Sequence, residues 1–107
     1  MSGNKFKLSK PIQTHGGEVS ELTLREPTAR SFMNHGEPFK VRIITNADDS
    51  QHVEFDFDNK IMSKFLADMI EEKVDDLLLG GLRTSDYLSL RMRGAEIIIG
   101  TAGTSPT

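Results

Sequence analysis

The sequence predicts an α+β fold in which two antiparallel β-hairpins precede two to three C-terminal α-helices. Up to Phe57, apolar and polar residues alternate with the period of two that is typical of half-buried strands. After Phe57, apolar residues recur at intervals of three and four, as in amphipathic helices. Glycine and proline clusters separate these segments and mark turns. We therefore expect strands in the first half of the chain and helices in the second.

The first hairpin is predicted to pair residues 5–12 with residues 19–25. Its apolar residues lie on one face of each strand: Phe6, Leu8 and Ile12 on the first, and Leu22 and Leu24 on the second. A two-residue turn at Gly16-Gly17 would set even positions opposite odd ones, so the two apolar faces would not meet. We therefore expect a loop of three or five residues with a glycine in the left-handed region.

A short helix is expected from Pro27 to about Asn34, since proline suits the first turn of a helix but cannot donate to a strand ladder. Residues 39–45 and 51–57 then form the second hairpin, with its loop centred on Asp48. That register matches opposite charges and apolar residues across the strands: Arg42 with Glu54, Lys40 with Asp56, Val41 with Phe55, and Ile43 with Val53. Both faces of the hairpin therefore favour one register.

An amphipathic helix capped by Asp58-Asn59 follows. Its apolar stripe comprises Ile61, Met62, Phe65, Leu66, Met69 and Ile70. The apolar pattern continues after a kink through residues 74–79, and Gly80-Gly81 is expected to end it with a positive φ. The last helix is predicted to begin at Thr84 or Ser85 and to stop at Gly100. Its predicted buried stripe comprises Tyr87, Leu88, Met92, Ala95, Ile98 and Ile99.

Length and composition limit the possible functions. The 107 residues fit a single domain, expected over residues 1–100, and the small polar residues 101–107 are expected to form a disordered tail. A formal net charge of −3 disfavours nucleic acid as a partner, because phosphate contacts need a basic face. No apolar run is long enough for a membrane span. The absence of cysteine excludes disulfides and thiolate metal sites, and suits a reducing cytoplasm.

No catalytic motif emerges from the sequence. Glu54, Asp56 and Asp58 alternate along one strand, but Lys40 and Arg42 oppose them, so we interpret this row as a solvated face. Metal-ligand spacing is also missing from the three histidines, which are expected in solvated loops: His15, His35 and His52. Phosphate-binding glycine loops, nucleophile elbows and dinucleotide fingerprints are absent. We therefore expect no enzymatic activity, no cofactor and no metal.

Two apolar triplets exceed what one small core can bury: Leu77-Leu78-Leu79 and Ile97-Ile98-Ile99. A helix cannot bury three successive side chains against one surface, so part of each triplet is expected to be exposed. The candidate partner-binding residues are Leu78, Leu79, Ile97, Ile98 and Ile99. Burial of the same residues in a homo-oligomer, such as a homodimer, is the alternative.

The N-terminal part of the chain carries a further pattern: Lys10-Pro11-Ile12, Gly16-Gly17, Val19, and Leu22-Thr23-Leu24-Arg25-Glu26-Pro27-Thr28-Ala29. This pattern resembles the opening block of the phage tail assembly chaperone family of contractile-tailed, Mu-like bacteriophages and prophages. The later order is similar too, with an apolar helix, a leucine-rich junction, and a final helix opened by Leu82-Arg83-Thr84-Ser85-Asp86-Tyr87. The resemblance covers most of the chain.

The resemblance implies a non-catalytic role in virion morphogenesis, in the cytoplasm of a bacterial host. It also implies a partner, the long and largely helical tape-measure protein, which such chaperones keep soluble before the tail tube polymerises. They are absent from the mature virion. This role requires an apolar surface that accepts amphipathic helices with low selectivity. Flexible thioethers suit such a surface, and the candidates for it are Met62, Met69 and Met92.

Two other functions stay open from the sequence. One is a small DNA-binding regulator, with a helix-turn-helix around Gly80-Gly81 and Arg83, Arg91 and Arg93 facing phosphate. The net charge and the two preceding hairpins argue against it. The other is a structural component of the tail, which would be retained in the finished particle.

Overall fold

A computed structural model describes residues 4–100 of the chain. The elements are, in order, β1 (Asn4–Thr14), β2 (Gly17–Leu24), α1 (Ala29–His35), β3 (Phe39–Thr45), β4 (Gln51–Phe57), α2 (Asn59–Met69), α3 (Asp76–Leu79) and α4 (Thr84–Ile99). The strands form two antiparallel pairs, β1 with β2 and β3 with β4. This confirms the predicted α+β class, with two hairpins before the C-terminal helices. The predicted disordered tail, residues 101–107, lies outside the described residues.

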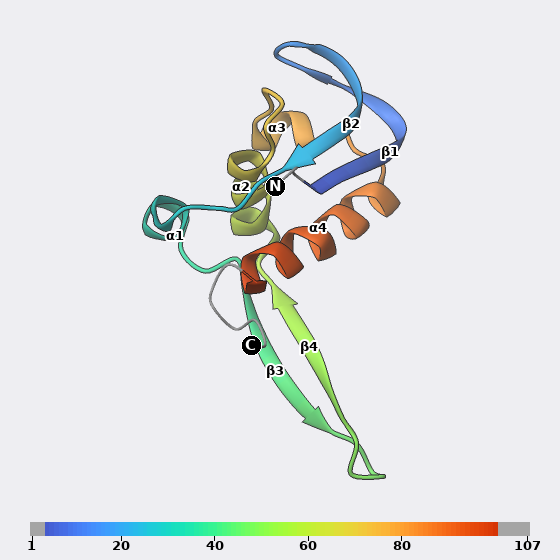
Figure 1. Cartoon of the computed structure of the whole chain (residues 1–107), viewed down its shortest axis with the longest axis vertical. Coiled ribbons are helices and arrows are strands. Elements are labelled where there is room, and N and C mark those ends of the chain that lie inside the picture. Colours follow the sequence, from blue (N-terminus) through green and yellow to red (C-terminus); the bar gives the residue numbers. More distant parts are fainter. Residues whose placement is uncertain (1–3, 101–107) are drawn as a thin grey trace.

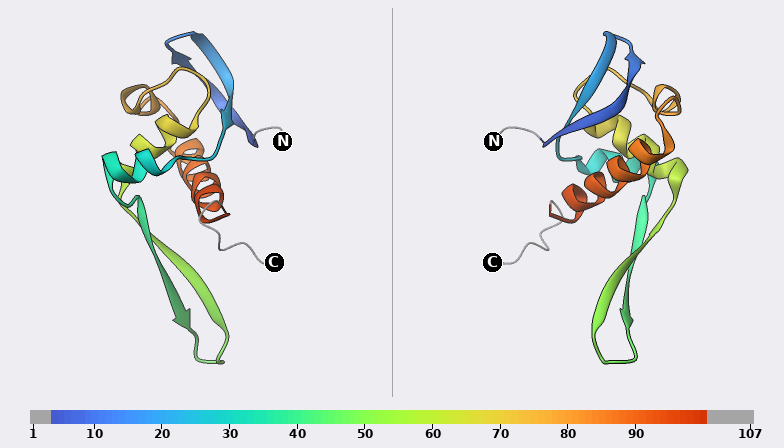
Figure 2. Two further views of the ribbon diagram at one scale, coloured as in Figure 1. Left: turned by 60° about the vertical axis from the view of Figure 1, so that its left-hand side comes forward. Right: turned by 90° about the vertical axis from the view of Figure 1, so that its right-hand side faces the viewer.

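The two hairpins have different surroundings. β1 and β2 curl over α2, α3 and α4, and together with α1 these elements make up what we call the body (Figure 1). β3 and β4 extend away from the body as a twisted ribbon, which we call the arm (residues 39–57). Figure 2 shows from two further sides that the arm projects freely. The molecule is accordingly elongated, with principal extents of 49 × 28 × 27 Å.

The core of the body is built around α2. Four of its side chains are completely buried: Met62, Phe65, Leu66 and Met69. They form one apolar cluster with Leu22 and Leu24 of β2 and Leu90 of α4. Glycine at position 94 lets α4 approach α2 closely, because a Cβ atom there would lie 2.8 Å from Cδ2 of Leu66. The predicted cap of α2 is confirmed, since the Asp58 carboxylate accepts from the amide of Ile61 at 3.2 Å.

The first hairpin turns more tightly than the sequence predicts. Thr14 pairs with Gly17, so the connection consists of two residues, His15 and Gly16, and the predicted loop of three or five is wrong. Gly17 has a φ of 118°, a region that favours glycine. The Thr14 hydroxyl closes the turn, because it donates to the carbonyl of Gly17 at 2.6 Å and accepts from the amide of Gly16 at 3.1 Å.

A bulge in β1 allows a tight turn although the apolar residues of the two strands would otherwise face opposite sides. Near the open end of the hairpin Phe6 faces Leu22, whereas near the turn Ile12 faces Val19. Between these pairs, residues 8–11 oppose only one residue of β2. The extra residues change the parity of the register partway along β1, so Ile12 stays buried although the turn is short.

The predicted register of the second hairpin is confirmed. All the predicted pairs occur: Arg42 with Glu54, Lys40 with Asp56, Val41 with Phe55, and Ile43 with Val53. The Arg42 guanidinium lies 3.4 Å from the Glu54 carboxylate. Because both side chains are largely exposed, this ion pair contributes little to stability, and the register depends on the turn and the apolar face.

The chain does not continue beyond α2 as a kinked helix. Backbone pairing with the end of β2 redirects it, since the amide of Glu71 donates to the carbonyl of Thr23 at 2.8 Å. α3 is therefore a separate short helix, capped by the Asp75 side chain, which accepts from the amide of its third residue. The helix ends at Leu79, directly before Gly80-Gly81, as predicted, but the backbone conformation of these glycines differs from the prediction. Neither Gly80, whose φ is −63°, nor Gly81 has the predicted positive φ.

α4 begins at Thr84 as predicted, and it buries Ala95 and Ile98 of the predicted stripe but not the whole stripe. The sequence predicts Leu88 and Met92 inside, whereas both are exposed. The residues that α4 turns inward are Asp86, Leu90, Gly94, Ala95 and Ile98. The absence of a side chain at Gly94 allows close contact with Leu66 of α2, and this contact sets the rotation of the helix. No helix among residues 4–100 is long and apolar enough to cross a membrane.

A buried carboxylate ties the first turn of α4 to the bulge of β1. Asp86 accepts hydrogen bonds from the Ser9 amide at 3.0 Å and from the Ser9 hydroxyl at 2.9 Å. Asp86 is 7% exposed, and an acidic residue is tolerated at such a position only with hydrogen-bond partners. The contact therefore holds the first hairpin onto the N-terminal end of α4.

Asp86→Ala is expected to lower the free energy of unfolding by about 1–3 kcal/mol, because two hydrogen bonds to a charged acceptor are lost. Chemical denaturation followed by circular dichroism measures the change. Glu96→Ala removes an exposed acidic residue of the same helix and is the matched control. It should alter the free energy by less than about 0.5 kcal/mol. Equal effects of the two substitutions would show that the contact with Ser9 does not stabilise the fold.

Candidate functional site

The arm presents an uncovered apolar face. The odd-numbered residues of β3 and β4 share this face, and three of them are strongly exposed: Ile43 at 67%, Val53 at 53% and Val41 at 48%. Among residues 4–100, β3 and β4 make their extensive contacts with each other and not with the body. Even-numbered residues form the opposite, charged face. Exposed apolar patches of this kind are typical of surfaces that bind partners.

An aromatic cluster joins the apolar face of the arm to the body. The ring centroids of Phe39, Phe55 and Phe57 lie 5.3 to 5.7 Å apart. Arg91 of α4 stacks over the ring of Phe57, with its guanidinium carbon 4.1 Å from the centroid. The same guanidinium donates to the side-chain oxygen of Asn59 at 3.0 Å. A cation–π contact and a hydrogen bond from one side chain thus fix the base of the arm to α4.

Tyr87 supports the same junction from one turn earlier in α4. Its hydroxyl donates to Oδ1 of Asn59 at 3.0 Å, the atom that also accepts from Arg91. Partial burial raises the pKa of the Tyr87 hydroxyl, while the positive charge of Arg91 acts in the opposite direction. The hydroxyl therefore stays protonated at neutral pH and continues to donate, which makes it a structural group.

An apolar hollow of about 550 Å³ lies where the arm meets α1 and α4. Phe39 and Val41 of β3 line it together with Phe32 of α1, and Ile98 and Ile99 line it from the end of α4. The other lining residues are Glu37, Pro38 and Lys40. The hollow is therefore mostly apolar.

The hollow and the apolar face of the arm meet at Val41, which belongs to both. We call the combined surface the apolar strip, made up of Phe32, Phe39, Val41, Ile43, Val53, Ile98 and Ile99. It runs from the body onto the projecting ribbon, and its charged neighbours at the hollow are Glu37 and Lys40. Such a surface can bind apolar side chains, and it contains no arrangement of groups suited to bond making.

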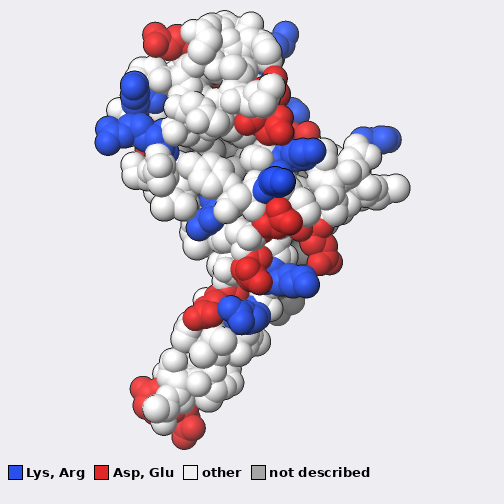
Figure 3. All heavy atoms as spheres, turned by 180° about the vertical axis from the view of Figure 1, so that it is seen from behind, with Lys and Arg blue, Asp and Glu red and all other residues white. Residues whose placement is uncertain are grey.

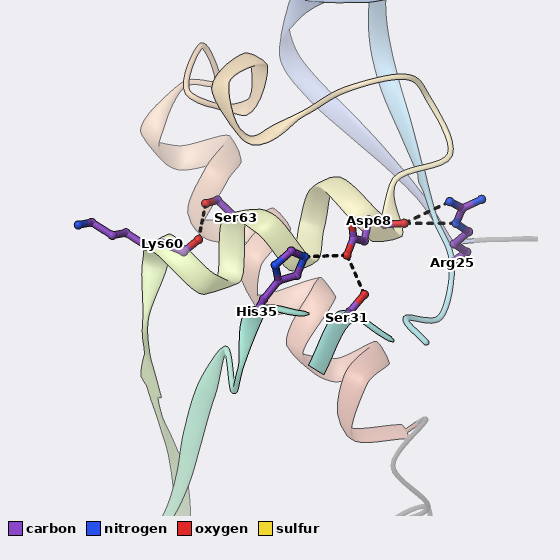
Figure 4. Close-up of polar contacts among 6 residues, drawn as sticks. All are labelled: Arg25, Ser31, His35, Lys60, Ser63 and Asp68. Atoms are coloured by element: carbon purple, nitrogen blue, oxygen red, sulfur yellow. Dashed lines mark hydrogen bonds and ion pairs between the residues drawn. The ribbon is translucent and has the colours of Figure 1, made fainter. Parts of the chain in front are cut away.

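Asp68 of α2 holds α1, and with it Phe32, beside the hollow. Its carboxylate accepts from the Ser31 hydroxyl at 2.8 Å and lies 3.0 Å from Nε2 of His35 (Figure 4). Its backbone carbonyl also accepts from the Arg25 guanidinium, at 3.2 and 3.4 Å. The ring of Phe32 packs edge-on against an aromatic ring of α2, with 4.8 Å between centroids. These contacts position one wall of the hollow.

The tip of the arm is acidic. The Asp48 carboxylate accepts from the hydroxyl of Ser50 at 2.6 Å and from its amide at 3.1 Å. These hydrogen bonds lower the pKa of Asp48. In Figure 3, acidic atoms lie at the tip, charged atoms of both signs gather where the arm joins the body, and the stretch between is largely uncharged. The charge of the arm is therefore concentrated at its two ends on this side.

The structure divides the predicted partner-binding residues. Leu79 and Ile98 belong to the core, whereas Leu78, Ile97 and Ile99 are partly exposed. Ile98 and Ile99 line the apolar hollow, while Leu79 lines a separate depression beside α2. The fold therefore does not bring the two triplets together as one surface.

Sequence reasoning missed the exposed part of the site, which consists of Val41, Ile43 and Val53 on the arm. It also left out Leu77, which lies outside the apolar strip and is 84% exposed. Alternation identifies which residues of a hairpin share a face, but not whether another element covers that face. One signal was available: β3 begins directly after Pro38, and α2 follows directly after Asp58. Such short connections anchor both ends of the hairpin at its base.

Three other predicted features have clear outcomes. Met62 and Met69 are completely buried and face the core, while Met92 is exposed. Each histidine ring lies within 3.2 Å of a carboxylate, and only His15 occupies a turn: the pairs are His15 with Asp75, His35 with Asp68, and His52 with Glu54. No group of three or more metal-ligating side chains occurs within the described residues.

Two of the three arginines of the DNA-binding alternative, Arg91 and Arg93, have partners within the chain. Arg91 stacks on the arm, and Arg93 lies 4.0 Å from the carboxylate of Glu96. α3 has only four residues, which is too short for a helix that supports a recognition helix. The structure therefore offers no observation in favour of that alternative.

One protein family matches most of this chain. The family is described as "Phage tail assembly chaperone proteins, E, or 41 or 14", and its model matches residues 5–94. The match includes both hairpins, α1 to α3 and the greater part of α4. It confirms the resemblance seen in the sequence. Searches of curated proteins and of solved structures find no significant match.

Aspartate is expected to have opposite consequences at Ile98 and at Ile43. Ile98→Asp places a carboxylate in the core and should lower the free energy of unfolding by about 3 kcal/mol or more. Ile43→Asp lies on the exposed arm and should change that free energy by less than about 0.5 kcal/mol. Chemical denaturation of both variants measures the difference. Similar losses at the two positions would mean that the arm is covered in the free chain.

Proposed function

Because this chain belongs to the phage tail assembly chaperone family, we propose that it binds and solubilises the tape-measure protein during tail morphogenesis. It does so without catalysis, in the cytoplasm of the bacterial host. It leaves before the tail is complete and is absent from the mature virion. The observation that carries the proposal is the apolar strip, whose arm residues Val41, Ile43 and Val53 are strongly exposed.

The geometry of the strip suits an amphipathic helix. Its hollow has two apolar walls, contributed by β3 and by α1 with the end of α4. Grooves of this kind accept the apolar face of a helix, with anchors one turn apart. Selectivity is expected to be low, because the lining offers shape and apolar area and few polar contacts. A client with many similar helical segments fits such a site.

The binding strength expected from the strip is moderate. Fully burying one aliphatic side chain is worth roughly 1.5–3 kcal/mol, so two or three anchors give useful but reversible binding. Reversibility is required, because the growing tail tube must displace the chaperone. A deeper and more polar site would hold the tape-measure protein too tightly for this exchange.

Co-expression with the tape-measure protein tests the proposal. Val41→Asp and Ile99→Asp, placed on opposite walls of the hollow, should each weaken co-purification about tenfold or more, because a charge replaces an apolar anchor. Circular dichroism checks that each variant is folded, and Val41 is exposed enough for the substitution to be tolerated. Ser89→Asp, an exposed position of α4, is the matched control and should leave co-purification unchanged.

Three outcomes would contradict the proposal. If Leu77→Asp abolishes co-purification while Val41→Asp does not, the client binds around the leucine triplet, near Leu78 and Leu79. If purified tails contain the chain in a fixed amount, it is a structural component. If the chain retards DNA in a gel in a salt-dependent way, it binds phosphate and not an apolar client.

A further inference from the structure

Within residues 4–100, the backbone of the arm has an unpaired edge on each side. At its two ends, the amide of Asn46 donates to the carbonyl of Ser50 at 2.7 Å, and the amide of Asp58 donates to the carbonyl of Pro38 at 2.9 Å. Both pairs join even-numbered residues of one register. In an antiparallel ladder, hydrogen-bonded and non-hydrogen-bonded pairs alternate. The even-numbered residues of the arm therefore bond inward, and the odd-numbered ones direct their amide and carbonyl groups outward.

These outward groups have no backbone partner in the described part of the chain. The residues concerned are Val41 and Ile43 on the β3 edge, and Val53 and Phe55 on the β4 edge. A two-stranded ribbon alone is marginally stable, and an open edge is a template for another strand. Each of these four residues also contributes to the apolar face of the arm. An added strand would extend that face as well as the ladder.

Charge decides between the two edges. Two β3 strands paired about Val41 place Lys40 of each copy opposite Arg42 of the other, which brings like charges together. Paired about Ile43, they place Arg42 opposite Ile44, so neither register of the β3 edge matches opposite charges. The β4 edge carries an imidazole and a carboxylate that can bond each other, because His52 precedes Glu54 by two positions. When two β4 strands pair about Val53, each Glu54 lies opposite His52 of the other copy. Within one chain these two side chains already approach to 3.2 Å, so they are suited to bond each other.

We propose that two copies of this chain associate through β4, with Val53 on the two-fold axis. The arms then form a four-stranded antiparallel sheet, ordered β3, β4, β4 and β3. Val53 is an outward-bonding residue, so it meets its counterpart as a hydrogen-bonded pair. The axis is normal to the sheet, which keeps both apolar faces on one side and places the two bodies at opposite ends. Closed two-fold symmetry of this kind is the commonest form of oligomer.

A single cysteine tests this geometry directly, because the chain contains no other. In a hydrogen-bonded antiparallel pair the Cα atoms lie about 5.5 Å apart, within the range that a disulfide spans. Val53→Cys should therefore form covalent dimers on mild oxidation. Ile43→Cys, which faces Val53 across the same ribbon and is similarly exposed, is the matched control. It should cross-link at least tenfold less.

Proline at the same two positions provides a second, non-covalent test. Val53→Pro removes an outward amide that the hairpin itself does not use, so the arm should fold while the dimer is lost. Ile43→Pro removes the equivalent amide on the β3 edge and should leave the dimer intact. Sedimentation equilibrium should give twice the chain mass of 11.9 kDa for the wild type and for Ile43→Pro, and a single mass for Val53→Pro.

The proposal fails if the wild type sediments as a monomer at every concentration. It also fails if Ile43→Cys cross-links as readily as Val53→Cys, since the association then uses another surface. These measurements use the purified chain alone, so they are independent of client binding. Ile99→Asp should weaken client binding and leave the dimer unchanged, which separates the failure of one proposal from the failure of the other.

Discussion

The burial of α2 between the first hairpin and α4 is the constraint on which the other elements depend. Four completely buried side chains on this helix contribute about 6–12 kcal/mol of apolar transfer free energy before the entropy of folding is subtracted, as much as the net stability of a small domain. Two polar side chains, one at the N-cap of α2 and one on its outer surface, then fix the neighbouring elements. Asp58 caps its start where the arm ends, and Asp68 holds α1 beside the hollow. The direction of the arm follows from the position of α2.

The two hairpins show how the same local pattern leads to different structures. The first hairpin closes onto the body, because the bulge in β1 and the contact from Ser9 to Asp86 bend it over α4. The second has a regular register and no bulge, so nothing bends it back. Its base is fixed by Arg91 and Phe57, and beyond that point it extends into solvent. Regularity of pairing, and not lack of apolar residues, is what leaves the arm uncovered.

Features encoded within one element could be predicted from the sequence, whereas features that depend on contacts between elements could not. The register of the arm follows from its apolar alternation and its turn, and the cap at Asp58 follows from residue type. The rotation of α4 depends on Gly94 meeting Leu66, residues that are far apart in the chain. The bulge in β1 could not be predicted for a similar reason. The ladder hydrogen bonds that it interrupts are partly replaced by bonds from Ser9 to Asp86, which is far away in the sequence. Of the predicted site residues, Ile98 and Ile99 lie at the hollow, but the walls that complete it come from β3 and α1.

The two-fold arrangement proposed for the arms gives the apolar strip a defined length. Val53 is level with Ile43, and the hollow lies beside Val41 and Phe39, about three residues away. With about 3.4 Å per residue along the strands and about 4.8 Å between strands, and with β3 at both outer edges of the sheet, the hollows of the two copies would lie roughly 25 Å apart. A helix of about 17 residues would cover that distance and contact both hollows at once. Two weak contacts linked in this way bind more tightly than either alone. Under the proposed function, each hollow would release its anchors separately, so an advancing tail tube would meet one weak contact at a time.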